Sequence, residues 1–275
     1  MAHNIHSWYF KDSIEREIKW AGKYGAKGEK RAKRKKATPE QIARQNQQNK
    51  EKKLRRLIKA NFLPGDFWIT LKYPKGTRKT TEEYKKDITV FITRCRREWK
   101  KRNTPFKFIY RLEIGKCGGI HLHMICNRLD PEKGKMDTDT ILQKAWQQGR
   151  INYESLYDAG GFQALAEYIA KETEDIGQLL LFDKSEQKAY RDYSCSRNLE
   201  RPEPEIKEYK RRTVRSLVQE GPEPTPGYYI DKDSIRQGIN PYNGLSYCHY
   251  IEYKIQNPQK SGYMKGNIHI CSGQS

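Results

Sequence analysis

Two histidines separated by one residue stand in an otherwise apolar run, residues 120–126. This pattern predicts a β-strand, in which successive side chains point to opposite faces. His121 and His123 would then share one face, while Leu122 between them packs into a core on the other. Two imidazoles that converge on one side suit a divalent cation. A pair of strand histidines that only packs or faces solvent is the alternative interpretation.

A carboxylate is expected beside this pair. Residues 106–114 alternate as a half-buried strand does, and a glycine-bearing segment, residues 115–119, connects them to the histidine strand. If the two strands form a hairpin folded about Cys117, Glu113 stands directly opposite His121. Two imidazoles and a carboxylate, with positions left open for phosphate oxygens, would make a Lewis-acid site.

Tyr168 and Lys171 stand about one turn apart on a predicted helix over residues 162–174. Tyr168 lies at the margin of the apolar stripe, so its ring can lean towards a sheet while its hydroxyl stays accessible. A phenol has an ordinary pKa of about 10 and is a poor nucleophile unless a cation or a metal helps to ionise it. Lys171 could supply that charge or hold a phosphate. A tyrosine that packs with its hydroxyl in water is the alternative.

The hydrophobic pattern also predicts the elements that must position these residues. In chain order they are a strand over residues 67–73, a helix from Thr80, strands over residues 106–114 and 120–126, a helix over residues 141–148, a strand over residues 151–157 and the helix over residues 162–174. This order predicts an α+β fold, with a mostly antiparallel sheet and helices on one side.

The formal net charge of +20 over 275 residues favours a polyanionic partner, of which nucleic acid is the commonest. From Lys23 to Lys59 there are fifteen Lys and Arg against three Glu, a net of +12. Thr38 followed by Pro39 and Gln41 is typical of a helix start, so a basic helix is predicted here. A solvated charged face is the alternative to phosphate contact. The expected nucleic-acid contacts in this segment are Lys33, Arg34, Lys35, Lys36, Lys52, Lys53, Arg55 and Arg56.

The remaining composition excludes several classes of protein. The six cysteines are scattered with no Cys-x-x-Cys, which argues against a zinc ribbon or a redox dithiol. No apolar run is long enough to span a bilayer, and the N-terminus lacks the regions of a secretory signal. The basic segment has no sustained apolar face, which disfavours a membrane-surface role. We therefore expect a soluble intracellular protein.

Taken together, these residues resemble the HUH endonucleases, and more closely the rolling-circle replication initiators (Rep proteins) of bacterial plasmids and phages. Three stretches between about residue 62 and residue 175 carry the resemblance, to the first motif, the metal-binding motif and the nucleophile motif of that family in turn. They are Phe67-Trp68-Ile69-Thr70-Leu71-Lys72-Tyr73, Gly119-Ile120-His121-Leu122-His123-Met124-Ile125 and Ala166-Glu167-Tyr168-Ile169-Ala170-Lys171.

The resemblance implies that His121 and His123 bind Mg²⁺ or Mn²⁺, with Glu113 as a third ligand. It implies that Tyr168 attacks a phosphodiester of single-stranded DNA at an origin hairpin, which leaves a 5′-phosphotyrosine and a free 3′-OH for a polymerase. Lys171 would support the developing charge. The implied fold is a ferredoxin-like or palm-like antiparallel sheet of about five strands with flanking helices, and the implied location is the bacterial cytoplasm.

Two departures restrict this interpretation. Some relatives carry a second tyrosine one turn after the first, whereas this chain has Glu172 there, so a single-tyrosine enzyme is predicted. The chain also lacks a Gly-x-x-x-x-Gly-Lys-Ser/Thr loop, so unwinding would need a separate host helicase. Residues 193–199 are similar to a stretch common in such initiators, in which Arg197 either packs or contacts DNA.

We predict three regions: a basic, largely helical N-terminal extension over residues 1–60, an endonuclease domain over residues 61–200, and an irregular C-terminal extension of unknown role over residues 201–275. A relaxase or transposase with the same chemistry on another DNA end is one alternative. A non-catalytic protein that binds single-stranded nucleic acid is the alternative from another class, and in it the histidines and Tyr168 would be structural.

Overall fold

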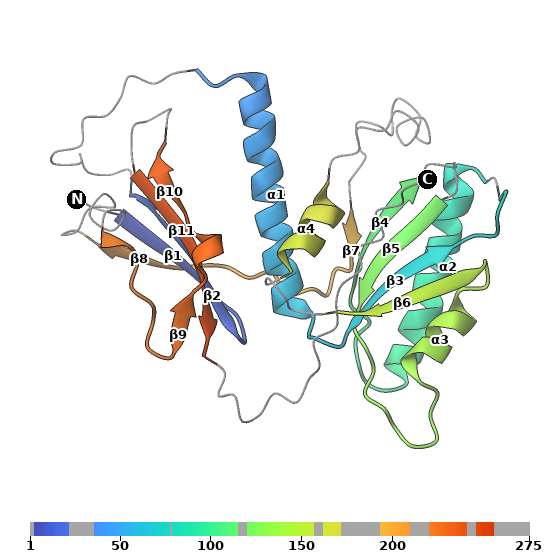
Figure 1. Ribbon diagram of the computed structural model, residues 1–275. Coiled ribbons are helices and arrows are strands. Elements are labelled where there is room, and N and C mark those ends of the chain that lie inside the picture. Colours follow the sequence, from blue (N-terminus) through green and yellow to red (C-terminus); the bar gives the residue numbers. More distant parts are fainter. Residues whose placement is uncertain are drawn as a thin grey trace. The chain divides into compact units, whose positions relative to one another are not determined.

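The computed structural model describes residues 3–21, 36–77, 79–114, 120–156, 162–171, 193–209, 220–240 and 246–255. The chain divides into two compact units, Ala37–Pro202 and a second unit formed by Met1–Lys36 with Glu203–Ser275. Each unit contains an antiparallel sheet, and the four α-helices described belong to the first (Figure 1). The fold is therefore α+β, as predicted.

The first unit is built on a five-stranded sheet in the order β6-β3-β5-β4-β7, with every neighbouring pair antiparallel. Its elements are α1 (Pro39–Asn61), β3 (Phe67–Lys72), α2 (Thr81–Lys100), β4 (Phe108–Ile114), β5 (Ile120–Cys126), α3 (Thr138–Ala145), β6 (Arg150–Ser155), α4 (Gln163–Ala170) and β7 (Ser194–Cys195). The predicted order of strands and helices is confirmed.

Capping residues fix where the two long helices begin. Thr38 accepts a hydrogen bond from the backbone N–H of Gln41, and the Gln41 side chain accepts one from the N–H of Thr38. Thr80 and Glu83 form the same capping box at the start of α2. These reciprocal bonds satisfy backbone donors that a helix leaves without partners. In the described part of the chain, no helix has the length and apolar character needed to cross a membrane.

Helices cover both faces of this sheet, α2 and α3 on one side and α1 and α4 on the other (Figure 1). On the first side, Leu71 and Leu122 pack against Phe91 of α2. On the second, Ile109 and Ile125 pack with apolar residues of α1 and α4. The expectation of helices on one side is corrected, because the central strands bury apolar side chains on both faces.

The second unit contains a six-stranded sheet that the sequence did not indicate. Its order is β10-β11-β2-β1-β8, and β9 also pairs with β11. The strands are β1 (His3–Tyr9), β2 (Ser13–Trp20), β8 (Glu205–Tyr209), β9 (Tyr228–Ile230), β10 (Arg236–Ile239) and β11 (Ser246–Lys254), with a 3₁₀ turn, η1 (Lys232–Ser234). The Arg16 guanidinium donates to the fully buried Glu252 carboxylate at 2.6 Å and joins the two ends of the chain within this sheet.

The predicted three regions differ from this division. Residues 3–20 form two strands rather than part of a helical extension, and the C-terminal region contributes four strands rather than irregular structure. Helix α1 belongs to the first unit, so the boundaries fall at residues 37 and 202 rather than at 61 and 200. The physical reason is that β2 pairs with β11, more than 200 residues away in sequence. A local pattern does not contain such a pairing.

Candidate functional site

The hairpin of β4 and β5 places the predicted carboxylate beside the histidines. Glu113 pairs with His121, and Arg111 pairs with His123. Directly paired residues of antiparallel strands lie on the same face, so these four side chains share the face opposite Leu122. The register predicted from the sequence is therefore the one observed.

Tyr168 reaches this face from α4. The helix buries Ala166 and Ile169 in the second core cluster, and Tyr168 at its margin remains 39% exposed. Its hydroxyl donates to Oε2 of Glu113 at 2.6 Å and lies 3.2 Å from Nε2 of His123. Nε2 of His123 is in turn 3.0 Å from Oε2 of Glu113. Three side chains from two strands and a helix thus meet at one point.

Two residues of β3 hold the ring of His123. The indole of Trp68 stacks on the imidazole with ring centres 5.5 Å apart and an interplanar angle of 15°, and it meets the Tyr168 ring edge-on at 5.9 Å. Oγ1 of Thr70 lies 3.2 Å from Nδ1 of His123. With Nδ1 occupied by this contact, Nε2 is the nitrogen presented to the site. The sequence contained a signal for both residues, because they alternate with the core residues of β3.

The local electrostatics set the protonation states. The hydrogen bond with His123, helped by the one from Tyr168 and by the Arg111 charge, lowers the pKa of Glu113 to about 2 against the opposing effect of burial. Burial lowers the pKa of His121, and the nearby His123 and Lys72 act in the same direction. Glu113 is therefore ionised and His121 neutral at pH 7, the forms that metal ligands require.

The phenol of Tyr168 is held in its protonated form. Burial raises its pKa well above the ordinary value of 10, and the hydrogen bond and charge of Glu113 raise it further. The Arg111 charge opposes this rise. In this arrangement Tyr168 is a hydrogen-bond donor, and a change in the Glu113 charge is one way to make it a better nucleophile.

Arg111 fixes the end of the helix that carries Tyr168, a role that sequence reasoning missed. Its side chain is buried, and Nη1 donates to three backbone carbonyl oxygens at the C-terminal end of α4. The acceptors are Tyr168 at 3.0 Å, Ile169 at 3.3 Å and Lys171 at 2.6 Å. Gln47 of α1 donates to the remaining carbonyl, that of Ala170, at 3.0 Å. A helix end has four carbonyls without helical partners and a negative dipole end, so a buried cation suits it.

The donor set was tested for its fit to a divalent ion. In the described ranges, no three His, Cys, Asp or Glu side chains are gathered closely enough to chelate a metal as they stand. The 3.0 Å from His123 Nε2 to Glu113 Oε2 nevertheless matches the spacing of about 3 Å between adjacent ligands of an octahedral ion with bonds of about 2.1 Å. His121 stands beside both, with its ring centre 6.3 Å from that of His123. Two imidazoles and a carboxylate on one face therefore fit such an ion in chemistry.

Lys171, also predicted to act here, is exposed. Its carbonyl accepts from Arg111, but its ammonium has no hydrogen bond or ion pair with any residue that the structure describes. The structure therefore brings Tyr168, Glu113 and His123 into contact and does not bring the Lys171 side chain into that contact.

The predicted nucleic-acid contacts are divided in the structure. Lys33, Arg34 and Lys35 lie outside the described residues. Among the others, Lys36, Lys53 and Arg197 are exposed, Lys52 is half-buried, and Arg55 and Arg56 are buried. The Arg55 guanidinium donates to the side chain of Gln163 on α4, so it joins two helices within the unit.

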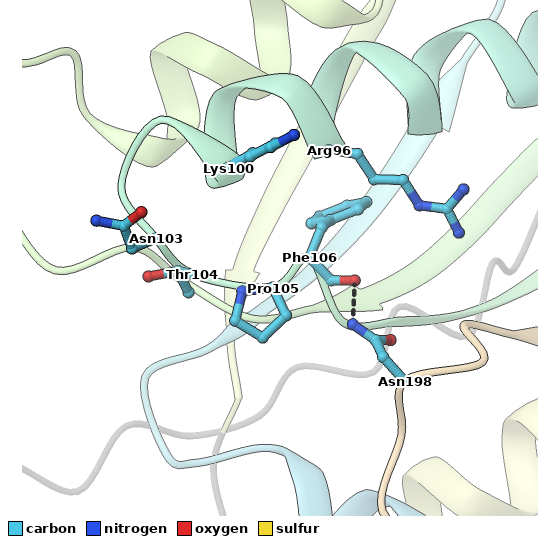
Figure 2. Close-up of a pocket in the computed structure, with 7 residues that line it drawn as sticks. All are labelled: Arg96, Lys100, Asn103, Thr104, Pro105, Phe106 and Asn198. Atoms are coloured by element: carbon cyan, nitrogen blue, oxygen red, sulfur yellow. Dashed lines mark hydrogen bonds between the residues drawn. The ribbon is translucent and has the colours of Figure 1, made fainter.

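Residues 193–199 complete the edge of the sheet. β7 pairs with β4, and Ser196 exchanges two hydrogen bonds with the backbone of Phe108, through its Oγ at 3.1 Å and its N–H at 2.9 Å. The Asn198 amide donates to the carbonyl of Phe106 at 3.2 Å, as Figure 2 shows. This stretch therefore has a structural role in the described part of the chain.

A pocket of about 390 Å³ lies beside Asn198, at the C-terminal end of α2 (Figure 2). It is lined by Arg96, Lys100, Asn103, Thr104, Pro105, Phe106 and Asn198. None of these residues belongs to the cluster around Tyr168. The chemistry described above is thus on an open face of the sheet and not in this pocket.

Comparison with known proteins gives one match. Residues 66–173 match the model of a family of replication-associated proteins, the ORF2 family. The matched region includes β4, β5 and α4, and with them Glu113, both histidines and Tyr168. The match is consistent with a replication initiator of the Rep type and supports a role in DNA replication. No curated protein and no solved structure matches the chain.

Proposed function

We propose that this protein nicks single-stranded DNA at a replication origin, with Tyr168 as the nucleophile and with Mg²⁺ or Mn²⁺ as cofactor. The observation that carries the proposal is the contact of the Tyr168 hydroxyl with Glu113 and His123, on the face where His121 also lies. A tyrosine that only packed would have no reason to bring its hydroxyl to a carboxylate and two imidazoles. The family match over the same residues supports the setting in replication.

In the proposed reaction, Oη of Tyr168 forms a bond to the scissile phosphorus and the bond from that phosphorus to the 3′ oxygen breaks. The 3′ oxygen leaves with the electron pair and takes up a proton, while the phenol loses one. The products are a 5′-phosphotyrosine and a free 3′-OH that a polymerase can extend. Oε2 of Glu113, 2.6 Å from the hydroxyl, is placed to receive the phenol proton.

The residues present explain why a cation would be needed. The Glu113 charge raises the pKa of Tyr168 and so opposes the loss of its proton. A divalent ion held by His121, His123 and Glu113 would neutralise that charge, favour the phenolate and polarise the phosphate. Trp68 and Thr70 keep His123 oriented, and Arg111 keeps the backbone of Tyr168 in place.

The rest of the proposal follows from what the chain carries. Lys171, exposed one turn from Tyr168, would support the developing phosphate charge. A single tyrosine would leave rejoining to a second subunit or another route, and a host helicase and polymerase would act on the nicked origin in the bacterial cytoplasm. The exposed lysines at the start of α1 and along it would contact the DNA backbone.

The test is the formation of a covalent adduct. The full-length protein is incubated with a pool of end-labelled single-stranded oligonucleotides of random sequence, with Mn²⁺ or with a chelator, and separated under denaturing conditions. Tyr168→Phe is compared with Tyr153→Phe, a matched loss of a hydroxyl from β6, where the Tyr153 side chain packs with Phe67 against the other face.

We expect a labelled adduct with the wild type and with Tyr153→Phe in Mn²⁺, and none with Tyr168→Phe or with chelator. Equal cleavage by Tyr168→Phe would remove the nucleophile assignment. Binding of the oligonucleotides without any adduct would favour a non-catalytic single-strand binder instead.

A further inference from the structure

The face of the sheet that carries the histidines continues beyond them to the edge strand β6. Glu113 pairs with His121, His121 pairs with Lys72 of β3, and Lys72 pairs with Arg150 of β6. Because paired residues share a face, these four side chains form one row across four adjacent strands. Neighbouring strands are about 4.8 Å apart, so Arg150 stands about 10 Å from His121 along the row.

The outer half of this row is cationic and accessible. Lys72 is half-buried and Arg150 is exposed. Within the described ranges, neither charged group has a hydrogen bond or an ion pair. Exposed Asn152, which pairs with Thr70, adds a neutral amide in the next row. The carboxylate on this face of β6 is Glu154, four residues along the strand from Arg150, which is about 13 Å.

The position of Lys72 is unfavourable for metal binding taken alone. Its charge contributes to the lowered pKa of His121, so the ammonium is within electrostatic reach of that imidazole. The same charge repels a divalent cation at the histidines. An anion bound over Lys72 removes this conflict, because it is attracted by the ammonium and by the cation together.

We propose that Lys72 and Arg150 bind phosphate groups of the DNA strand adjacent to the scissile phosphate, so that the single strand crosses the sheet from β4 towards β6. The identity of the scissile phosphate rests on the proposed nicking function, whereas the contact of the row with a single strand does not. The row supplies point charges at the spacing of the strands and no base-reading groups, so the contact is independent of sequence.

The test is the salt dependence of binding by the full-length protein. The probe is a fluorescein-labelled oligo(dT) of twenty nucleotides, and anisotropy is measured in EDTA so that no nicking interferes. Lys72→Met combined with Arg150→Met is compared with Lys86→Met combined with Arg97→Met. The control pair is exposed on α2, which covers the opposite face, and removes the same charge.

Each lost phosphate contact on a single strand reduces the slope of log K against log salt by about 0.7. The row variant is therefore expected to show a slope smaller by about 1.4 and binding about 25-fold weaker at 0.1 M salt. The control pair is expected to stay within about threefold of the wild type. An unchanged slope in the row variant, or an equal loss in the control pair, overturns the proposal.

Two further measurements keep the outcome decisive. Thermal melting shows whether the row variant is folded. If it is not, Arg150→Met alone, at an exposed edge position, is expected to lower the slope by about 0.7, and no change overturns the proposal. The result also separates from nicking: loss of the Tyr168 adduct would leave this binding result standing, and unchanged binding would leave the adduct standing.

Discussion

Replacement of Arg111 tests whether the end of α4 must be held in place for chemistry. Nη1 of Arg111 carries two hydrogens and shares them among three carbonyls, so its contacts count as about two charged hydrogen bonds. At about 1.5–3 kcal/mol each, Arg111→Met is expected to lower the free energy of unfolding by about 3–5 kcal/mol. Arg111→Lys, which keeps the charge with a different geometry, is expected to lose about half of that.

The effect on rate is expected to exceed the effect on binding. Tyr168 is itself one of the residues whose carbonyl Arg111 holds, so its hydroxyl moves when the last turn of α4 relaxes. A displacement of about 1 Å in a reacting group costs about 100-fold in rate. Single-turnover nicking by Arg111→Lys is expected to fall by about this factor, while the Kd for single-stranded DNA stays within about threefold.

A matched control exists on the other side of the sheet. Nη1 of Arg94 donates to the carbonyl of Ala145, the last residue of α3, at 3.0 Å. Arg94→Met removes the same kind of helix-end contact far from the site in the fold, and it is expected to lower stability by about 1–2 kcal/mol with little change in nicking. Nicking by folded Arg111→Lys within threefold of the wild type, or a rate loss no larger than that of Arg94→Met, would refute the reasoning.

Three further predictions follow from the same geometry. Because the pKa of folded Glu113 is about 2, its bonds stabilise the metal-free protein above the ordinary pKa of 4.5 and are lost as pH falls towards 2; acid melts should therefore show a smaller loss for Glu113→Gln. His121→Asn should weaken Mn²⁺ binding by at least about tenfold, measured by the signal of free Mn²⁺ in electron paramagnetic resonance. Ser196→Ala should lower the free energy of unfolding by about 1–2 kcal/mol in urea, because the buried N–H of Phe108 loses its acceptor.

Local features of the site could be predicted from the sequence because they depend on near neighbours. The alternation around His121 fixed which side chains share a face, and the short connection between β4 and β5 fixed the pairing with Glu113. The helix of Tyr168 followed from its apolar stripe, and the start of α1 from Thr38 and Gln41. In each case the partner is within one hairpin or one helical turn.

The features that could not be predicted depend on distant partners. Arg111 sits on a strand like any polar residue, and only the packing of α4, more than 50 residues later, makes it a helix-end contact. Arg55 has the same charge as the lysines beside it, yet the tertiary fold buries it against Gln163. The strands of residues 3–20 have their partners beyond residue 203, and those pairings leave no local pattern.

The most direct test of the central claim is the mass of the peptide that contains Tyr168 after reaction. The wild-type protein is incubated with single-stranded DNA and Mn²⁺, digested with nuclease and trypsin, and analysed by tandem mass spectrometry. The account predicts a nucleotide joined through a 5′-phosphate to Tyr168 and to no other tyrosine. An adduct on another residue, or cleaved DNA with Tyr168 unmodified throughout the reaction, would contradict it.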